Sequence, residues 1–414
     1  MSSRPRTHRP RFVAVPVQPH LLFFWAYNLI YLLPLVVIYV WGYTDVGAID
    51  QIGLDSRSLR AILLVYAEGL FAFSLGSIFV KVILSHLRAS NASSGYSVPD
   101  IGITEKLGIV LLAAMFIGSK AALIPLDVYR GYVLADIEFK SGLWSFSLVC
   151  SEFVLLAATL VLFSDSRRNL LGFVVLSILN GVNLLHGTRI IFVVNLMILL
   201  LYAYLRGFLT LRRVLILGPP IFISVLLLAY AVFVSRSGVI DNSRLTTANT
   251  VSPLVYESLF SQISLRNVVN SSDIVNSTGA LPSFVSDIVL GVMPRALFPD
   301  KDDLQYLERF AYMSPLGAFN GYAAGLIYFG VFWPIFYLVL GGTASWLHAK
   351  ARTNAYWLIL YAYFTGDVLF RFMRDGYTIP IKILVNIIEL LAILLIVRAL
   401  MRDLPRPTQR AGGR

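Results

Sequence analysis

Apolar runs long enough to cross a lipid bilayer recur along the whole chain, and this feature limits its fold more than any other. A transmembrane helix needs about 20 predominantly apolar residues. Of the 414 residues, 57% are hydrophobic and only 14% are charged, and the mean hydropathy is +0.74. A soluble protein of this composition would expose large apolar patches to water. We therefore predict an all-α polytopic membrane protein.

The runs predict about 10 transmembrane helices. The fifth and sixth runs are individually short and meet at the sequence Gly187-Thr188-Arg189, where we expect tilted or interrupted helices. The predicted spans are residues 21–41, 59–84, 107–126, 143–163, 170–186, 190–205, 214–234, 322–347, 355–372 and 380–400.

The distribution of lysine and arginine orients these spans, because short cytoplasmic loops carry an excess of both residues. With the N-terminus inside, 19 of the 34 basic residues are cytoplasmic, and every short inner loop is net basic. Both termini are then cytoplasmic. The predicted regions are a basic tail (1–20), a seven-helix membrane region (21–234), a large outer loop (235–320), a three-helix membrane region (321–400) and a second tail (401–414).

The outer loop contains two stretches with the pattern of short amphipathic helices. One begins near Pro253, and the other covers residues 283–292. We expect these helices to lie on or over the outer membrane surface rather than to form an independent domain. The apolar residues at helical spacing in the first stretch are Leu254, Leu259, Ile263, Val268 and Val269.

Charge and motif content exclude several classes of function. The net charge of +11 would suggest a nucleic-acid partner in a soluble chain, but here the positive charges stand at the ends of apolar runs. Membrane orientation and anionic lipid headgroups explain them, so we expect no nucleic acid. Cys150 is the only cysteine, which excludes an internal disulfide and a cysteine-based metal site. No zinc-ligand cluster, P-loop or Gly-x-Ser-x-Gly motif occurs, and we expect no metal and no cofactor.

Several arginines fall on the predicted outer side, against the usual distribution of positive charge. An arginine near the apolar region of a membrane is costly, so a group of them requires an explanation. A guanidinium group forms two parallel hydrogen bonds to the oxygens of a phosphate, and it keeps its charge when partly desolvated. We therefore expect an anionic ligand that carries a diphosphate. The outer arginines that suggest it are Arg189, Arg236, Arg295, Arg371 and Arg374.

Short motifs in the second half of the chain resemble those of the Wzy-type O-antigen and exopolysaccharide repeat-unit polymerases, which are related in architecture to the O-antigen ligases. The resemblance covers roughly residues 180 to 375. It includes Gly187-Thr188-Arg189, the large outer loop, the string Pro294-Arg295-x-x-Phe298-Pro299-x-Lys301, and the glycine-rich segment from Asn320-Gly321-Tyr322 to Gly330. Members of the family often have a proline after the lysine, where this chain has Asp302.

The resemblance implies a membrane glycosyltransferase with a GT-C-like helical fold in a bacterial inner membrane. The donor would be a growing glycan on undecaprenyl diphosphate, and the acceptor would be a lipid-linked repeat unit at the periplasmic face. Arg189 and Arg295 would stabilise the departing diphosphate without a metal, by preorganised electrostatics. Arg236, Arg371 and Arg374 would bind substrate. The sequence leaves open whether a chain-length regulator docks on the outer loop.

A general base for the acceptor hydroxyl stays unassigned. His186 is the only histidine predicted near the outer face, and Glu257, Asp287 and Asp375 are the other main candidates. Asp45, Asp50 and Asp55 in the first outer loop are further carboxylates within reach. No base is needed if departure of the leaving group runs ahead of proton transfer.

Two other functions remain as alternatives. An O-antigen ligase would use the same donor with a different acceptor, although the ligases favour a histidine in the large loop and this chain has none there. A transporter or flippase for the lipid-linked sugar would perform no bond chemistry, and it would carry charged residues inside several spans. Such residues are sparse here: Glu68, Lys120, Glu152, Asp367 and Glu389.

Overall fold

The predicted apolar runs form helices wherever the structure describes them. The computed structural model describes residues 17–41, 55–87, 154–163, 169–185, 189–209, 261–293, 305–314 and 319–403, and the isolated residues 111, 114, 115, 118, 213 and 216. These residues form helices and connecting turns and no β-strand. The all-α fold class is therefore confirmed for this part of the chain.

Five predicted spans are uninterrupted helices whose bounds lie within three residues of those expected. They are α1 (Pro19–Trp41), α2 (Ser56–Leu87), α5 (Asn169–Leu185), α6 (Arg189–Leu205) and α15 (Thr378–Asp403). The helix Val154–Phe163 covers the second half of the predicted fourth span. The third and seventh predicted spans lie outside the described residues, apart from a few isolated positions.

The eighth and ninth predicted spans are interrupted. The eighth consists of α11 (Gly321–Phe329), the 3₁₀ turn η5 (Gly330–Phe332) and α12 (Trp333–Ala351), and the ninth consists of α13 (Ala355–Tyr363), the π-helical turn η6 (Phe364–Val368) and α14 (Leu369–Arg374). Gly330 has a φ of +52°, which L side chains rarely adopt. Beside it, the Val331 amide donates to the Ser277 carbonyl at 3.1 Å. A residue of the outer loop therefore holds the break in the eighth span.

Three helical segments among the described residues are long and apolar enough to cross a membrane, and shorter apolar helices accompany them. The three are Pro19–Val36, Ser56–His86 and Gly321–Ala351. They support a protein embedded in a membrane. The total of about ten spans, the GT-C-like arrangement and the cytoplasmic position of both termini stay predictions. "Outer" and "inner" below refer to that predicted orientation.

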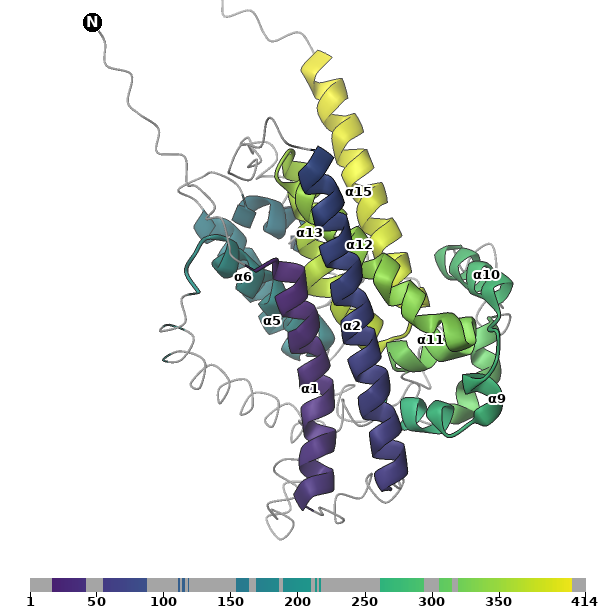
Figure 1. The fold of residues 1–414 in the computed structure, drawn as a ribbon. Helices are drawn as coiled ribbons and strands as arrows, with labels where there is room; N and C mark the ends of the chain where they lie inside the picture. The colour runs from purple at the N-terminus through teal and green to yellow at the C-terminus, as the bar shows by residue number, and fades with distance from the viewer. Residues whose placement is uncertain are drawn as a thin grey trace, which may run out of the picture.

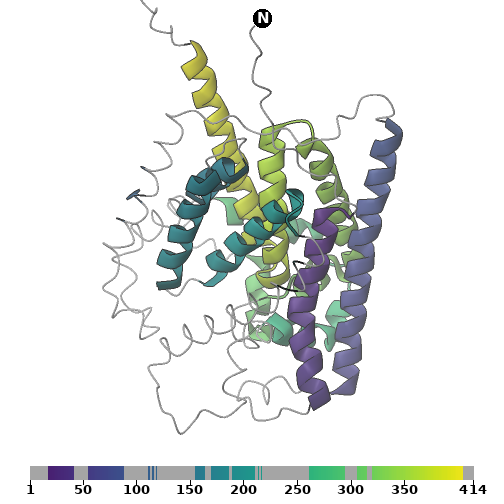
Figure 2. The same ribbon diagram turned by 90° about the vertical axis from the view of Figure 1, so that its left-hand side faces the viewer.

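The described helices form a bundle built around α2 and α12, which pack against each other along much of their length. Figure 1 shows α5 and α6 on one side of this pair and α9 (Ser272–Val275), α10 (Leu281–Val292) and α11 on the other. Seen from the side, α2 lies at the edge of the bundle next to α1 (Figure 2).

Glycines bring the backbones of α2 and α12 into direct contact. A Cβ atom at Gly76 of α2 would lie 1.9 Å from the Leu338 carbonyl oxygen, and a Cβ atom at Gly341 of α12 would lie 2.0 Å from the Phe73 carbonyl oxygen. No side chain fits in either place. Without a hydrophobic drive between helices in lipid, close packing through small residues is a main source of association.

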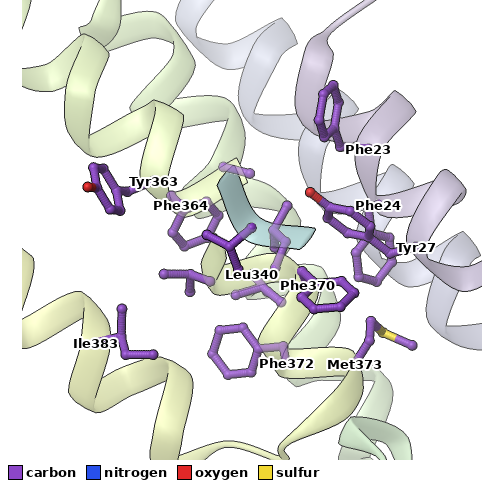
Figure 3. Close-up of a cluster of buried hydrophobic side chains, with 14 of the residues drawn as sticks. Phe23, Phe24, Tyr27, Leu340, Tyr363, Phe364, Phe370, Phe372, Met373 and Ile383 are labelled. Atoms are coloured by element: carbon purple, nitrogen blue, oxygen red, sulfur yellow. The ribbon is translucent and has the colours of Figure 1, made fainter. Parts of the chain in front are cut away.

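Aromatic side chains fasten α1 to both α2 and α14. Phe24 of α1 stacks on Phe73 of α2, with ring centroids 3.9 Å apart. Tyr27 of α1 meets Phe370 of α14 edge to face at 5.4 Å. Figure 3 shows these α1 side chains facing the residues of α14 across the buried cluster. Since each aromatic pair contributes about 0.5–1.5 kcal/mol beyond its buried area, the cluster fixes the position of α14.

A buried polar network closes the inner end of the bundle. The ring nitrogens of His20 lie 3.0 Å from the Tyr361 hydroxyl and 2.8 Å from the Ser77 hydroxyl. Ser77 donates to the Gln18 side chain at 2.9 Å, and Gln18 donates to Ser345 at 3.3 Å. Buried polar groups of this kind are stable only when they are hydrogen-bonded to one another. The network joins the start of α1 to α2, α12 and α13.

Both predicted stretches of the outer loop contain helices among the described residues, but the described part of the first, from residue 261, is buried rather than on a surface. Residues 261–269 are helical and residues 261–265 are all buried. Gln262 lies within hydrogen-bonding distance of the Tyr66 hydroxyl of α2, and it donates to the Tyr31 carbonyl of α1 at 3.3 Å. This helix is therefore part of the bundle. The second predicted stretch is α10, and the 3₁₀ helix η4 (Tyr306–Met313) follows it.

We predict that filling the glycine contact loosens the bundle. Gly76→Ala and Gly341→Ala should each lower the free energy of unfolding by about 1–3 kcal/mol, because the added methyl group meets a backbone carbonyl that cannot rotate away. Gly181→Ala on α5 is the control, since a Cβ there meets nothing within 4 Å. Thermal unfolding of the purified protein in detergent measures the difference. Equal melting temperatures for all three variants would contradict the packing argument.

A capped first turn begins α2. The Ser58 amide donates to Asp55 Oδ1 at 2.7 Å, which satisfies one of the backbone donors that every helix start leaves open. Hydrogen bonds from the Ser58 hydroxyl and amide hold the pKa of the Asp55 carboxyl below its ordinary value. Asp55, one of the first-loop carboxylates named as reachable from the outer face, thus has a structural partner.

We predict that this cap weakens in acid. A carboxylate with a lowered pKa stabilises the fold above its ordinary pKa and loses that contribution as the pH falls through the lowered value. Amide hydrogen exchange in residues 56–60, corrected for intrinsic rates, should therefore speed up in acid in the natural protein. Asp55→Asn, whose amide oxygen accepts at any pH, should show little of this dependence. The same acceleration in both proteins would contradict the assignment.

Candidate functional site

Four charged residues gather near the outer end of α14, and we call them the α14 charge cluster: Asp367, Arg371, Arg374 and Asp375. Arg371 Nε donates to Asp367 Oδ1 at 2.6 Å, and Arg374 Nη1 donates to Asp375 Oδ1 at 2.8 Å. A longer contact of 3.8 Å joins Arg371 Nη1 to Asp375 Oδ2. The two arginine side chains are 16% and 26% exposed, whereas the carboxylates are 4% and 9% exposed. Buried carboxylates thus fix guanidinium groups that stay partly accessible.

The π-turn η6 sets the position of Asp367. A π-turn displaces backbone carbonyls from the regular hydrogen-bond ladder, and such turns are frequent at functional sites. Here the Tyr27 hydroxyl donates to the Thr365 carbonyl at 2.9 Å and lies 3.3 Å from the Gly366 carbonyl. A Cβ at Gly366 would lie 2.8 Å from Cγ1 of Ile198, so glycine allows α6 to pack on the turn. Helices α1 and α6 therefore support the turn that carries the carboxylate.

Ion pairing makes these charges tolerable inside the bundle. Asp367 is 3% exposed, and an isolated carboxylate at such a site would lose its hydration without replacement. Removing one partner of a buried pair typically costs about 3–5 kcal/mol, because the other charge is left uncompensated. Arg371, one helical turn beyond Asp367, supplies the compensation. Each of the two therefore depends on the other.

Part of the outer loop covers the turn that follows the cluster. Gly376 stands between α14 and α15 with a φ of +71°. A Cβ built on it would lie 3.8 Å from Cδ2 of Leu307 in η4 and 3.7 Å from Cβ of Phe319. The 3₁₀ helix η4 and the segment before α11 are therefore in contact with the end of the cluster.

Asp287, one of the base candidates, anchors η4 to the bundle. It lies on α10 and is 1% exposed. Its two carboxylate oxygens accept from the amides of Tyr306 at 2.7 Å and Leu307 at 3.1 Å, and the Tyr328 hydroxyl donates to it as well. A carboxylate that accepts several hydrogen bonds at a helix start is well suited to a structural role. Its geometry favours positioning of η4 over proton transfer.

Arg189 begins α6 and lies on the same side of the bundle as Arg374. Helix α6 contacts η6 at Ile198, and its far end reaches the start of α1 through a hydrogen bond from Tyr204 to the Val17 carbonyl at 3.1 Å. Arg189 stands nine residues before Ile198, about 13 Å along the helix in the opposite direction. The first residue of α6 and the last residue of α14 therefore both lie at the end of the bundle that is predicted to be the outer one.

The remaining predicted site residues lie outside the described residues. These are Arg236, Glu257 and Arg295 of the outer loop and His186 before α6. Among the predicted residues, the structure thus brings Arg371, Arg374 and Asp375 together and places Asp287 in the neighbouring layer. The roles predicted for all of them stay predictions.

Sequence reasoning did not include Asp367 in the site. It named this residue only as a sparse charge within a span. The usable signal was its spacing: a carboxylate four residues before an arginine lies on the same helical face. The same argument applies to Asp375, which follows Arg371 by four residues.

A second polar group lies beside the site, centred on Asn320, which the sequence analysis named only as part of a motif and without a hydrogen-bonding role. Asn320 caps α11, because its side-chain oxygen accepts from the Tyr322 backbone amide at 2.9 Å. The backbone amide of Asn320 donates to the Ser264 hydroxyl at 2.9 Å. Its side chain also donates to the Tyr66 hydroxyl at 3.3 Å. Next in the chain, a Cβ at Gly321 would lie 1.8 Å from the Phe372 carbonyl oxygen. This network therefore joins helix 261–269 to α11 and, through Gly321, to α14.

The cluster is suited to holding an anion by charge-assisted hydrogen bonds. In the described part of the chain, no three or more histidine, cysteine, aspartate or glutamate residues gather in a group that could hold a metal ion. No protein-family model, curated protein or solved structure matches the chain.

We predict strong coupling between Asp367 and Arg371. Asp367→Leu and Arg371→Leu should each lower the free energy of unfolding by about 3–5 kcal/mol, because each leaves one uncompensated charge. The double variant should lose less than the sum of the two, with a coupling energy of about 1–3 kcal/mol. Reversible unfolding in mixed detergent measures the free energy of unfolding of the two single variants and of the double variant. Glu308→Gln, at an exposed position of η4, should change stability by less than about 0.5 kcal/mol. Additive losses would exclude the pairing.

Proposed function

We propose that this chain is an oligosaccharide repeat-unit polymerase of a bacterial inner membrane. It would transfer a growing glycan from undecaprenyl diphosphate onto a lipid-linked repeat unit at the periplasmic face. The observation that carries the proposal is the α14 charge cluster, in which Asp367 and Asp375 orient the guanidinium groups of Arg371 and Arg374. The sequence resemblance to Wzy-type polymerases supports it independently.

The proposed chemistry uses the two guanidinium groups of the cluster, which Asp367 and Asp375 balance in charge but leave partly exposed. A hydroxyl oxygen of the acceptor sugar attacks the anomeric carbon of the donor, and the bond from that carbon to the diphosphate oxygen breaks. Negative charge then develops on the leaving diphosphate. Preorganised arginines stabilise such charge more than water does, because they need no reorganisation during the reaction. Arg371 and Arg374 serve this role with Arg189 and Arg295, and the proposed mechanism has no metal-dependent step.

The base that takes the hydroxyl proton is left open among the predicted candidates. Of the two candidates that the structure describes, Asp375 is the one that stands beside both arginines of the cluster. Asp287 has both oxygens engaged at η4, which disfavours it. His186 and Glu257 remain candidates from the sequence.

A membrane fold suits this substrate, because the polyprenyl tail needs an apolar surface beside the reacting diphosphate. Exposed apolar side chains cover the described helices, among them Phe332 and Ile335 near the outer start of α12. The proposal places both termini in the cytoplasm and membrane lipids around the bundle.

A lipid-linked oligosaccharide transporter is the second candidate, and the buried carboxylate of Asp367 favours it. Ionisable residues inside membrane helices often mark transport pathways. A ligase with a different acceptor is chemically close to the polymerase and shares its donor site.

We predict that the purified protein lengthens a defined lipid-linked repeat unit in detergent or nanodiscs. Products longer than the substrate, resolved by gel or mass spectrometry, would support bond formation and exclude a transporter. Polymerisation should survive a chelator. Arg371→Lys and Arg374→Lys keep the charge but lose the planar fork, so the turnover rate should fall by about 10²–10³-fold.

Matched controls separate this result from unfolding. Arg309→Lys, an exposed arginine of η4 whose guanidinium lies 5.5 Å from the Tyr306 ring centre, should keep full activity. Each variant must elute as a single species by size-exclusion chromatography. In cells, Arg189→Ala and Arg295→Ala should abolish long-chain polysaccharide while the protein remains inserted. Normal chain-length ladders in these variants would rule out the diphosphate role.

A further inference from the structure

An acidic residue stands alone on the outward face of α2. Glu68 is exposed, and it makes no hydrogen bond or ion pair within the part of the chain that the structure describes. Its neighbours on that face are apolar: Leu64 is 60% exposed and Phe71 is 69% exposed. Both views place α2 at the periphery of the bundle, in front in Figure 1 and at the edge in Figure 2.

This carboxyl group lies at membrane depth. The segment Ser56–His86 of α2 is long and apolar enough to span a bilayer. Glu68 stands 12 residues from Ser56, about 18 Å along the helix, and 19 residues from Leu87, about 28 Å. The stretch between Arg60 and Lys81 is about 30 Å long, and Glu68 lies about 12 Å from Arg60, farther than a glutamate side chain extends along the helix. Contact with lipid alone would leave its polar atoms unsatisfied.

Six exposed residues of α2 follow the spacing of a helix–helix seam, and Leu63, Ala67, Phe79 and Ile83 are exposed beside them. Steps of four and three residues alternate along this face, which is the 3.5-residue repeat of two helices wound around each other. A single polar residue at one seam position fixes the register and the number of helices. The exposed seam residues are Leu64, Glu68, Phe71, Leu75, Ile78 and Val82.

We propose that this face of α2 binds the same face of a second copy of the chain, in a parallel two-fold dimer with the two Glu68 side chains near the axis. A symmetric interface requires a surface that complements itself. Among ionisable side chains at such an axis, a carboxyl group is suitable because its acid form both donates and accepts a hydrogen bond, whereas lysine and arginine only donate. Ala67, also exposed, leaves room beside Glu68 for close approach.

The opposite face of α2 is packed against the bundle, which holds the orientation of the exposed face fixed. Gly69 and Gly76 face inward, against Tyr322 and the backbone of α12, so the helix cannot rotate without breaking those contacts. The dimer requires only that α2 spans the membrane, and it does not depend on the proposed polymerase activity.

Cysteine crosslinking in native membranes tests the dimer. In a Cys150→Ser background, Leu64→Cys and Phe71→Cys should each form a disulfide-linked species of twice the chain mass on mild oxidation. Ile396→Cys, 60% exposed on α15, is the matched control and should not crosslink. No crosslinking at positions 64 and 71, equal crosslinking at 396, or a product with a different protein would overturn the proposal.

The role of the carboxyl group has its own readout. In lipid bilayers, Glu68→Leu should raise the dimer dissociation constant about tenfold, as expected for loss of one interhelical hydrogen bond. Glu68→Gln, whose amide also donates and accepts, should stay close to the natural protein. Both variants should melt as the natural monomer does in detergent, because Glu68 makes no hydrogen bond or ion pair within the described part of the chain. Unchanged dimerisation of Glu68→Leu would overturn the proposed role.

Discussion

The contact between the backbones of α2 and α12 is the constraint on which the rest of the bundle depends. It requires glycine on both helices, at Gly76 and Gly341, because each would-be Cβ meets a carbonyl oxygen at about 2 Å. Close approach lets Phe73 of α2 stack on Phe24 of α1, and α1 in turn supports the π-turn through Tyr27. The packing of α2 on α12 and of α1 on α2 therefore fixes the π-turn that carries Asp367. It also fixes Arg371, one helical turn further along α14.

The described parts of the outer loop are packed into the bundle and help to hold the charged side chains near its outer end. Helix 261–269 is buried against α1 and α2, η4 lies on the turn after α14, and Asp287 fastens η4 to α10. Polar side chains satisfy one another at each of these contacts, as they must in a low-dielectric setting. The guanidinium groups of Arg371 and Arg374 are therefore held in place before any ligand binds, which favours electrostatic stabilisation over induced fit.

The residues whose role depends on local spacing were predictable, and those whose role depends on long-range partners were not. Apolar runs located α1, α2, α5, α6 and α15 to within three residues, because helix length follows from membrane thickness. Charge placement singled out Arg371 and Arg374. The burial of residues 261–265 was missed, since an amphipathic pattern does not reveal whether its apolar side meets lipid or protein. Asp367 was missed as a site residue although its spacing from Arg371 is readable in the sequence, because local spacing does not reveal that the carboxylate is buried.

The sequence by itself determined that this chain forms apolar helices and where most of the described ones begin and end. These properties follow from composition and local periodicity. Tertiary structure alone decided which groups distant in the sequence meet: Asp287 with the start of η4, and Gln262 with Tyr66 of α2 and Tyr31 of α1. Tertiary structure also decided which face of α2 is exposed. The helix is apolar all round, and its glycines determine which face packs against α12.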